Sequence, residues 1–246
     1  QILKGTEPDV YLVLDEDFNT LASLGALKNL DMLVGGDKEF DFNVFYSSVY
    51  KAGQYEGSQY ALPMECNPTL MFVNKTLLQK EGIKVPDNDW TWDDFYDICK
   101  TIVKDSDGDG QMDQFGCYDY TWLQAVYSNG ITPFNQSGTS SNFLDEKFSQ
   151  SLEFVKRLEA TNRNYQVTSN DFDLGKVAFR PFTFSDYRTY MPYPWRIKKY
   201  SGFEWTCIRM PAGPSGDNRS EMSALMAGMS SRTEKKQCAW DFVKLL

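Results

Sequence analysis

Short apolar runs that pass directly into helices constrain the fold of this chain more than any other feature. Residues 10–14 (VYLVL) form one run, and residues 70–73 (LMFV) form another. The first run is typical of a parallel strand buried on both faces of a sheet, and the second predicts another apolar strand. We expect a helix over residues 18–24 after the first run, and a helix over residues 75–81, capped by Asn74, after the second. Strands that alternate with helices predict an α/β protein.

The most strongly patterned helix starts at Thr91. Thr91 and Asp94 form a capping box, and the helix dipole favours acidic residues in this first turn. The apolar residues recur at the spacing of one buried helix face: Phe95, Ile98, Cys99, Ile102 and Val103. We assign Trp90 and Trp92 to packing around this helix. A further helix is expected over residues 145–160, with four apolar residues facing inward: Phe148, Leu152, Val155 and Leu158.

The composition excludes several classes of function. The net charge is −9 and no basic stripe or tail is present, which argues against a nucleic-acid partner. No apolar run approaches the roughly 20 residues of a membrane-spanning helix. The chain contains no histidine, which removes Ser-His-Asp and Cys-His catalysis and histidine-based zinc sites. The five cysteines are widely spaced, and we interpret them as buried free thiols.

Both ends of the sequence are expected to be cut from a longer protein. Residues 1–4 would form the last turn of a helix closed by Gly5, and a single turn does not nucleate alone. The C-terminal helical pattern reaches residue 246 without a stop signal. The lack of a signal peptide in this sequence therefore says nothing about the compartment.

An acidic loop after the Thr91 helix has the spacing of a calcium ligand set. Residues 105–113 (DSDGDGQMD) match the first nine positions of an EF-hand loop. The predicted ligands are the carboxylates of Asp105, Asp107, Asp109 and Asp113, and the backbone carbonyl of Gln111. Gly116 stands at position 12, where the bidentate glutamate is absent, so Gln114 or a group from elsewhere must complete the shell. A structural Ca²⁺ and a solvated acidic turn remain the two interpretations.

Several motifs occur in an order that resembles a known family. The order GxxYALP, FVNKxLLxxxGI, PDNDWTWDDF and DxDGDGxxDxFG resembles the extracellular solute-binding proteins of ATP-binding cassette importers, in the maltose-binding-protein-like, sugar-binding group. Residues 7–30, residues 175–187 (GKVAFRPFTFSDY) and the segment from residue 210 onward are similar to the same group. The resemblance covers nearly the whole chain. It implies an α/β, two-lobe periplasmic-binding-protein-like fold of type II, with the first lobe incomplete.

The resemblance also implies how the chain is divided between the lobes. Residues 1–62 and 208–246 would form the first lobe, and residues 63–207 the second. The hinge crossings would lie near residues 61–67 and 205–210. Cys66 and Cys207 fall at these two crossings, so we expect them to be neighbours.

Ligand contacts are implied where the family places its strand-to-helix loops. The residues at matching positions are Glu16 and Asp17 in the first lobe, Glu65 and Asn67 at the first crossing, and Asp119, Tyr120, Trp122, Phe184 and Tyr187 in the second lobe. Sugars present hydroxyl groups and flat CH faces, which pair with carboxylates, amides and aromatic rings. A structural role stays open for many of them: helix capping for Glu16 and Asp17, turn formation at the crossing, and core packing for Tyr120 and Trp122.

The function implied by the resemblance is that of a non-catalytic extracellular receptor. It would bind a sugar or oligosaccharide between its lobes, as a monomer with a structural Ca²⁺, and deliver the ligand to an ATP-binding cassette permease. Its expected location is the surface of a Gram-positive bacterium, through a lipid anchor, or the periplasm. Two alternatives remain. Acidic and aromatic residues also describe the cleft of a carbohydrate-active enzyme such as a glycosidase, and the acidic loop fits a calcium-organised adhesion or sensor module.

Overall fold

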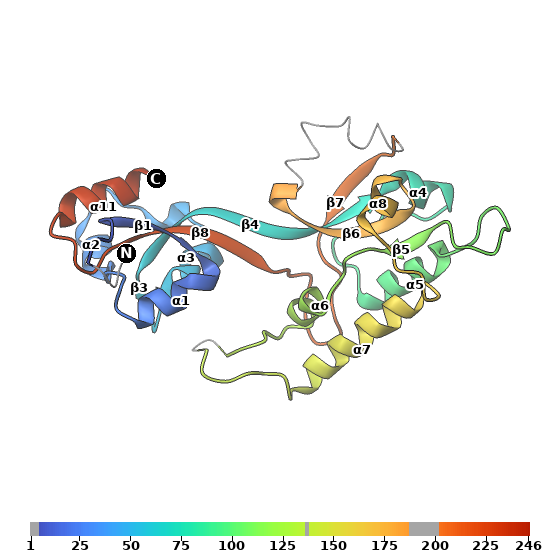
Figure 1. Cartoon of the computed structure of the whole chain (residues 1–246), viewed down its shortest axis with the longest axis horizontal. Coiled ribbons are helices and arrows are strands. Elements are labelled where there is room, and N and C mark those ends of the chain that lie inside the picture. The colour runs from blue at the N-terminus through green and yellow to red at the C-terminus, as the bar shows by residue number, and fades with distance from the viewer. Residues whose placement is uncertain (1–4, 136–137, 187–201) are drawn as a thin grey trace. The chain divides into compact units, whose positions relative to one another are not determined.

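A computed structural model describes residues 5–135, 138–186 and 202–246 of the protein. The chain divides into two compact units: unit 1 comprises Gln1–Asn67 and Met222–Leu246, and unit 2 comprises Pro68–Glu221. Figure 1 labels the helices and strands of both units. The helical turn predicted at residues 1–4 lies outside the described residues.

The elements of each unit follow in chain order. Unit 1 contains β1 (Val10–Leu14), α1 (Asp15–Ser23), α2 (Asp31–Gly36), the 3-10 helix η2 (Phe42–Val44), α3 (Ser47–Ala52), β2 (Gln54–Tyr55), β3 (Ser58–Gln59), the first half of β4 (Ala61–Asn74), β8 (Met222–Met229) and α11 (Lys236–Leu245). Unit 2 contains the second half of β4, α4 (Lys75–Lys80), α5 (Trp92–Ile102), β5 (Phe115–Cys117), α6 (Trp122–Ser128), α7 (Glu146–Ala160), α8 (Ser169–Asp173), β6 (Val177–Thr183) and β7 (Trp205–Ile208). Across the residues that the structure describes, no helix has the length and apolar content to cross a membrane.

The first apolar run forms β1, as predicted, but in an antiparallel sheet. β1 pairs with β8 in antiparallel register, and β8 lies between β1 and β4. The prediction of a parallel strand buried on both faces is wrong here. Val13 is buried, whereas Leu12 is 63% and Leu14 is 48% exposed. Leu12 and Leu14 alternate with Val13 along the strand, so they share the face of β1 that is open to solvent in the described residues.

The helix after β1 begins earlier than the sequence predicted. α1 starts at Asp15, so Glu16 and Asp17 belong to its first turn rather than to a loop. Three consecutive acidic residues suit this position, because negative charge is stabilised at the N-terminus of a helix. Asp15 also accepts a hydrogen bond from the backbone N–H of Ala224 (2.7 Å), and burial raises the pKa of Asp15.

The second apolar run lies at the centre of unit 2. Here β4 pairs antiparallel with β6 on one side and with β7 on the other, and β5 lies parallel to β6. Asn74 caps α4 as predicted, because its side chain accepts a hydrogen bond from the Leu77 N–H (3.0 Å). The same side chain donates to the Gly175 carbonyl (3.0 Å), which ties the end of β4 to the residues before β6.

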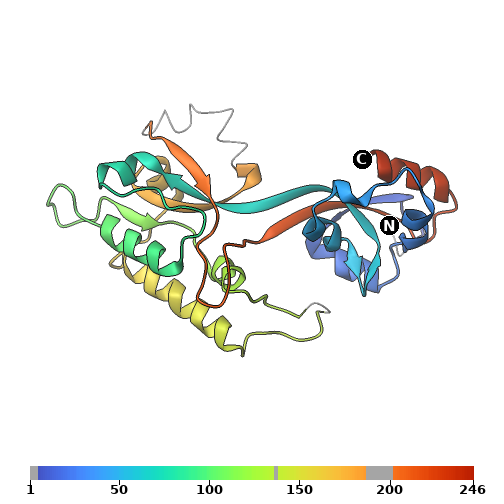
Figure 2. The same ribbon diagram turned by 180° about the vertical axis from the view of Figure 1, so that it is seen from behind.

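α5 and α7 pack side by side in unit 2, as both Figure 1 and Figure 2 show. The capping box of Thr91 and Asp94 and the buried face of α5 are confirmed. Trp90 and Trp92 belong to the same hydrophobic core, as predicted. The Trp92 ring stacks on Phe154 of α7, with 4.2 Å between ring centroids, so the two helices share one aromatic core.

The helix predicted over residues 145–160 is α7, with Asp145 as its N-cap. Three of the four residues predicted to face inward are buried: Phe148, Val155 and Leu158. The prediction for Leu152 is wrong, since this side chain is exposed and Phe154 is buried instead. Leu152 lies on the side of α7 that lines the cavity described below, and this accounts for an apolar residue outside the core.

The boundaries between the units lie at residues 67/68 and 221/222. The first adjoins the predicted crossing at 61–67, but the second differs from the predicted crossing at 205–210. β7 pairs with β4 opposite residues 71–74 of unit 2. Ala212 exchanges backbone hydrogen bonds with both Trp90 and Trp92 (2.9 Å each). These contacts hold residues 208–221 on unit 2, which the prediction had assigned to the first lobe.

The five cysteines are free thiols. Cys99 and Cys117 are buried as predicted, whereas Cys238 is exposed. Burial raises the pKa of Cys207 to about 12, which keeps this thiol protonated and unreactive at neutral pH. In the β4–β7 ladder Cys207 stands opposite Phe72, and not opposite Cys66 as the prediction of neighbouring cysteines suggests.

Candidate functional site

The loop after β5 carries several of the predicted ligand-binding residues. β5 and β6 run parallel, with Cys117 opposite Phe179, so their carboxyl ends lie at the same edge of the sheet. Ligands of α/β proteins commonly bind at such an edge. Asp119 has a left-handed φ of 64°, which reverses the chain between β5 and α6. The loop therefore holds its side chains at a position suited to a ligand.

A capping box fixes the end of this loop at the start of α6. Thr121 is the N-cap, and both its N–H and its hydroxyl donate to Oε1 of Gln124 (2.8 and 2.5 Å). Trp122 is the first residue of the helix and is 41% exposed. Its ring lies 5.8 Å from the ring of Phe148, measured between centroids. The cap thus holds an exposed indole directly beside the loop.

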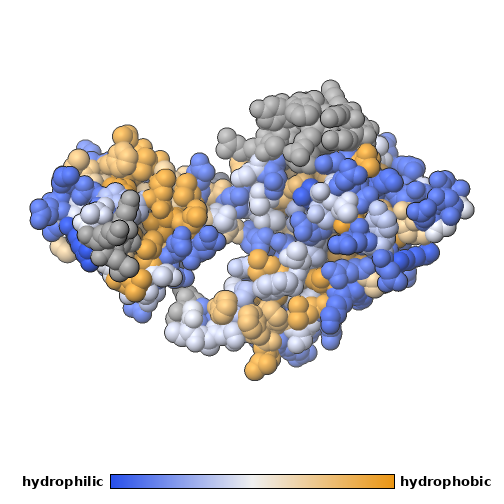
Figure 3. All heavy atoms as spheres, viewed as in Figure 1, coloured by the Kyte–Doolittle hydropathy of each residue, from blue (hydrophilic) through white to orange (hydrophobic). Residues whose placement is uncertain are grey.

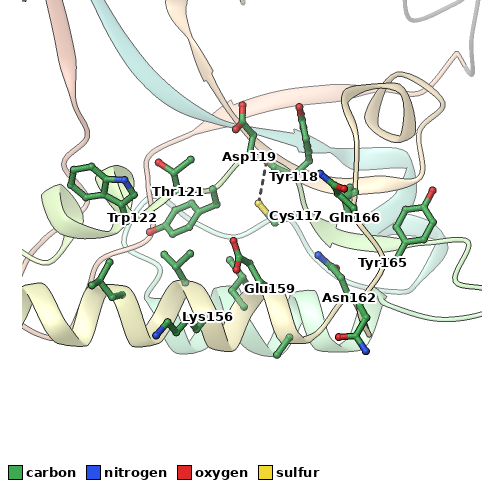
Figure 4. Close-up of a pocket in the computed structure, with 17 residues that line it drawn as sticks. Cys117, Tyr118, Asp119, Thr121, Trp122, Lys156, Glu159, Asn162, Tyr165 and Gln166 are labelled. Atoms are coloured by element: carbon green, nitrogen blue, oxygen red, sulfur yellow. Dashed lines mark hydrogen bonds between the residues drawn. The ribbon is translucent and has the colours of Figure 1, made fainter.

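A cavity of about 870 Å³ lies between this loop and α7. Polar and aromatic side chains from three segments line it: Asp119 and Trp122 from the loop and α6, Lys156 and Glu159 from α7, and Asn162, Tyr165 and Gln166 from the segment after α7. Figure 4 shows Glu159 rising from α7 toward the loop, while Asp119 projects on the side away from α7. The cavity lining thus includes three of the predicted ligand contacts, Asp119, Tyr120 and Trp122.

The lining combines aromatic rings with hydrogen-bonding groups. The Tyr165 ring stacks on Phe115, with 4.5 Å between centroids and 17° between planes, which holds the ring in place. Its hydroxyl donates a hydrogen bond to Oδ1 of Asp171 (3.4 Å), so its oxygen is left to act as an acceptor, and burial followed by the nearby Asp171 carboxylate raises the pKa of Tyr165. Carboxylate and amide groups nearby add further donors and acceptors. Such a mixture suits a ligand that has both hydroxyl groups and apolar faces.

Five of these lining residues were not singled out from the sequence: Lys156, Glu159, Asn162, Tyr165 and Gln166. The helical period predicts that the polar residues of α7 lie outside the hydrophobic core, and this is correct. A cavity forms at that side because the chain turns back after α7, where Arg163 and Asn164 adopt left-handed φ values of 50° and 68°. The asparagines Asn162 and Asn164 are a turn signal that the sequence does contain.

Tyr120, predicted as a ligand contact with core packing as the alternative, packs in the core and also lines the cavity. Its side chain is 5% exposed, and its ring packs edge-on against Phe95 (5.1 Å) and Phe154 (6.0 Å). Its hydroxyl lies 3.4 Å from the hydroxyl of Ser128, and burial raises its pKa. The helix start explains the difference from Trp122: Tyr120 precedes the N-cap Thr121 and packs into the core, whereas Trp122 is the first residue of α6 and is 41% exposed.

Phe184 follows β6 at the same edge of the sheet and is half-exposed, as a ligand contact requires. Nearby, Asp186 accepts hydrogen bonds from the N–H (3.1 Å) and hydroxyl (2.8 Å) of Thr183. This pattern resembles a helix cap, so the carboxylate of Asp186 has a structural partner. Tyr187 lies outside the described residues.

The remaining predicted contacts belong to unit 1. Glu16 and Asp17 are exposed on the first turn of α1, where helix capping was the alternative. Glu65 is exposed on β4, and Asn67 is half-buried at the last position of unit 1 on that strand. The extended backbone of β4 replaces the turn that we considered for these two residues.

The acidic loop at residues 105–113 has carboxylates gathered on one side. Ligand oxygens of Asp105, Asp107 and Asp109 lie within 4.8 Å of one another. Gly108 and Gly110 have left-handed φ values of 81° and 89°, which allow the sharp turn. Hydrogen bonds from the N–H groups of Gly110 and Gly108 lower the pKa of Asp105.

Two other predicted ligands of this loop have partners of their own. The Asp113 carboxylate accepts hydrogen bonds from the N–H (2.9 Å) and hydroxyl (2.8 Å) of Ser106, which lower its pKa. Gln114 is buried, and its side chain accepts from Lys80 (2.8 Å) and donates to Glu81 (3.1 Å). The suggestion that Gln114 completes the shell is therefore wrong. The all-oxygen donor set of the three aspartates still fits a hard cation such as Ca²⁺.

Comparison with known proteins places these observations in a family. The family described as bacterial extracellular solute-binding protein matches residues 1–246 of the chain. The match therefore covers both units and every predicted site residue.

Solved structures of similar fold are also found. An ABC substrate-binding protein from Listeria monocytogenes in complex with cycloalternan is 22% identical, covers 100% of this chain and has a TM-score of 0.72. The sugar-binding protein MalE from Xanthomonas citri is 17% identical, with 99% coverage and a TM-score of 0.79. The GacH receptor of Streptomyces glaucescens, solved with acarbose, is 22% identical, with 98% coverage and a TM-score of 0.66. The chain spans 62%, 62% and 61% of the length of these three proteins. The likeness confirms the predicted α/β fold of the periplasmic-binding-protein type.

Proposed function

Because this chain belongs to the bacterial extracellular solute-binding protein family, we propose that the protein is a non-catalytic receptor for a sugar or oligosaccharide. It would deliver this ligand to an ATP-binding cassette permease. The observation that carries the proposal is the cavity of about 870 Å³ in unit 2, which Asp119, Trp122, Glu159 and Tyr165 line. Among the solved structures of similar fold, one is a complex with cycloalternan, one is a receptor in complex with acarbose and one is a sugar-binding protein.

The cavity supports a carbohydrate because of how its groups are combined. The exposed Trp122 indole and the stacked Tyr165 ring offer flat surfaces to the CH faces of a sugar ring. Asn162, Gln166 and Glu159 offer amide and carboxylate groups to its hydroxyls. Membership of a receptor family favours this function over the glycosidase considered from the sequence.

The test is a binding screen on the full-length natural protein. Isothermal titration against monosaccharides and against malto-, manno- and cello-oligosaccharides should give saturable, one-to-one binding. The Trp122→Ala variant should bind about tenfold or more weakly, since an aromatic residue at the centre of a site commonly contributes about 1.4 kcal/mol or more. Phe134→Ala is the matched control, because Phe134 is an exposed aromatic residue of unit 2 that does not line the cavity.

Three results would each contradict a part of the proposal. Catalytic hydrolysis of any of these oligosaccharides would favour the enzyme. Saturable binding of a peptide or polyamine, with no response to any sugar, would keep the receptor but overturn the carbohydrate assignment. Equal losses in Trp122→Ala and Phe134→Ala would remove the cavity from the proposal.

The family supports a proposed location for this protein. A protein of this family acts outside the cytoplasmic membrane, so we place this one in the periplasm or on the cell surface. A lipid anchor and a monomeric state are further parts of the proposal. Membrane fractionation and light scattering of the natural protein test the two parts separately.

We also propose that the loop at residues 105–113 binds a structural Ca²⁺. Asp105, Asp107 and Asp109 supply the carboxylates, and the Gln111 carbonyl and Asp113 fill the positions predicted from the EF-hand spacing. Ca²⁺ at a hundredfold excess over its Kd should stabilise unit 2 by about 2.7 kcal/mol. Thermal unfolding with Ca²⁺ and with EDTA measures the effect, and Asp107→Ala should abolish it. Identical melting curves with Ca²⁺ and EDTA would favour the solvated acidic turn.

A further inference from the structure

We propose that Gln124 and Glu221 are positioning residues that tie the loop of the candidate site to the two segments where the chain passes between the units. Gln124 lies on α6, directly behind Thr121 and Trp122 of the site. Glu221 is the last residue of unit 2. The physical link stands on the geometry of unit 2 alone, and its meaning for ligand capture rests on the receptor function proposed above.

The first half of the link joins the loop to Glu221. Oε1 of Gln124 accepts the N–H and hydroxyl of Thr121, so the orientation of this amide is fixed by the helix cap. The Nε2 group then points the other way and donates to Oε1 of Glu221 at 2.6 Å. A hydrogen bond from a neutral amide to a carboxylate is among the stronger ones in proteins. Gln124 therefore connects the start of α6 to Glu221.

The second half joins Glu221 to the other crossing. Thr69 is the second residue of unit 2 after the boundary at 67/68. Its hydroxyl donates to the same Oε1 of Glu221 (3.2 Å), and its backbone N–H donates to the Glu221 carbonyl (3.1 Å). The two segments that lead to unit 1 are thereby fastened to each other and, through Gln124, to the loop of the site.

The burial of this network argues for a role beyond stability. Thr69 and Gln124 are 4% and 7% exposed, and Oε2 of Glu221 is buried without a hydrogen-bond partner among the described residues. A buried carboxylate oxygen left without a partner is costly, and apolar side chains of similar size commonly give equal or greater stability. What a polar network offers is a single defined arrangement of the groups that it joins. Here those groups are the site loop and both crossings.

An exchange of hydrogen-bond polarity tests the link. Gln124→Glu keeps an oxygen for the Thr121 cap but places a carboxylate against Glu221, so the link breaks. Glu221→Gln alone keeps an uncharged oxygen acceptor for Gln124 and should accelerate exchange less than Gln124→Glu does. The double variant Gln124→Glu with Glu221→Gln reverses donor and acceptor, and so restores the link. Each variant is made in the full-length natural protein, without added ligand.

Hydrogen exchange at pH 7, followed by mass spectrometry, reads both ends of the network. In Gln124→Glu, amides of residues 66–72 should exchange about tenfold or more faster, because a hydrogen bond to a charged group has been lost. The double variant should return to within about threefold of the natural rate. Thr69→Val provides the reverse measurement: it should accelerate exchange at residues 121–126, and it carries the test if Gln124→Glu does not fold.

Three outcomes would overturn the proposal. They are unchanged exchange at residues 66–72 in Gln124→Glu, equal acceleration in β5 and β6 of the same unit, and no recovery in the double variant. The second outcome would mean that the pair only contributes to the stability of unit 2. Because no ligand is present, failure here is distinguishable from failure to find a sugar that binds.

Discussion

The two units differ in how the first turns of their α-helices are capped. In unit 2 each of the five α-helices that the structure describes has a side-chain N-cap: Asn74, Thr91, Thr121, Asp145 and Thr168. In unit 1 no described α-helix has a side-chain cap hydrogen bond. Large apolar side chains are exposed in unit 2, among them Phe134 and Leu144, and also in the smaller unit 1, where Leu12, Met32, Val44, Tyr46 and Leu245 are exposed. Figure 3 shows apolar residues gathered at the surface of this unit.

The difference in helix capping indicates which unit is stabilised by contacts among its own residues. Unit 2 is one continuous segment, 68–221, with caps on its helices and aromatic residues in its core. Unit 1 is assembled from two segments at opposite ends of the sequence. Monomeric soluble domains rarely leave large contiguous apolar surfaces open. We infer that unit 2 is self-sufficient and that unit 1 depends on contacts beyond its own residues.

This inference predicts that unit 2 folds when it is produced alone, whereas unit 1 does not. The polypeptide 68–221 produced alone should fold cooperatively, with near-ultraviolet circular dichroism and a single melting transition. The segments 1–67 and 222–246, mixed in equal amounts, should show neither the near-ultraviolet signal nor a cooperative transition. Two small separate segments bury too little apolar surface to offset the conformational entropy lost on folding.

Circular dichroism and dye binding to exposed apolar surface measure both samples. A molten, dye-binding state of 68–221 would contradict the comparison. So would cooperative folding of the two mixed segments.

Within the intact chain, substitution of a buried apolar residue in unit 2 and of an exposed one in unit 1 should give very different losses of stability. Phe95 is fully buried in unit 2, with edge-on contacts to the rings of Trp90 and Phe179. Phe95→Ala should destabilise unit 2 by about 3–5 kcal/mol, through lost transfer free energy and a cavity. Leu12→Ala in unit 1 should change stability by less than about 0.5 kcal/mol, since the side chain is already in solvent. Urea unfolding measures both, and similar losses would contradict the inference.

Sequence reasoning succeeded where local chemistry decides and failed where distant segments decide. The cap and buried face of α5 depend on residues within eleven positions of one another, so Thr91 and Phe95 were assigned correctly. Strand direction in β1 depends on β8, more than 200 residues away, and the apolar composition of Leu12 and Leu14 gave no sign of an exposed edge. Glu159 and Tyr165 were missed because the cavity exists only once the chain has turned back after α7.

Exchanging a cap between the units should move their stabilities in opposite directions. Thr91→Ala removes the N-cap of α5 and should cost about 1 kcal/mol. Leu14→Thr places a capping side chain at the N-cap of α1, where the backbone is already extended and Leu14 is half-exposed. It should add up to about 1 kcal/mol to unit 1. Hydrogen exchange in α5 and α1 measures each unit, and a loss of protection in α1 would contradict the prediction.

A polar contact in unit 1 joins α11 to Asp37, and its loss should have a smaller effect than the changes above. Asp37 accepts hydrogen bonds from Nζ of Lys244 (2.5 Å) and Nε1 of Trp240 (2.8 Å), both on α11. The Lys244 hydrogen bond, followed by the Trp240 one, lowers the pKa of Asp37 to about 2. A carboxyl group whose pKa is lowered by folding stabilises the folded state above its unfolded pKa of about 3.9. That contribution is lost as the pH falls through the folded pKa.

Unit 1 should therefore loosen between about pH 4 and pH 2, partly through protonation of Asp37. Trp240 is the sole tryptophan in the sequence of unit 1, so its indole N–H signal in NMR reports on this unit. Asp37→Asn should loosen α11 at pH 7 and flatten the dependence on pH in that window. Asp241→Asn is the matched control, because its carboxylate lies farther from Lys244, at 3.7 Å. If both variants keep the acid transition of the natural protein, the Asp37 contact does not fasten α11.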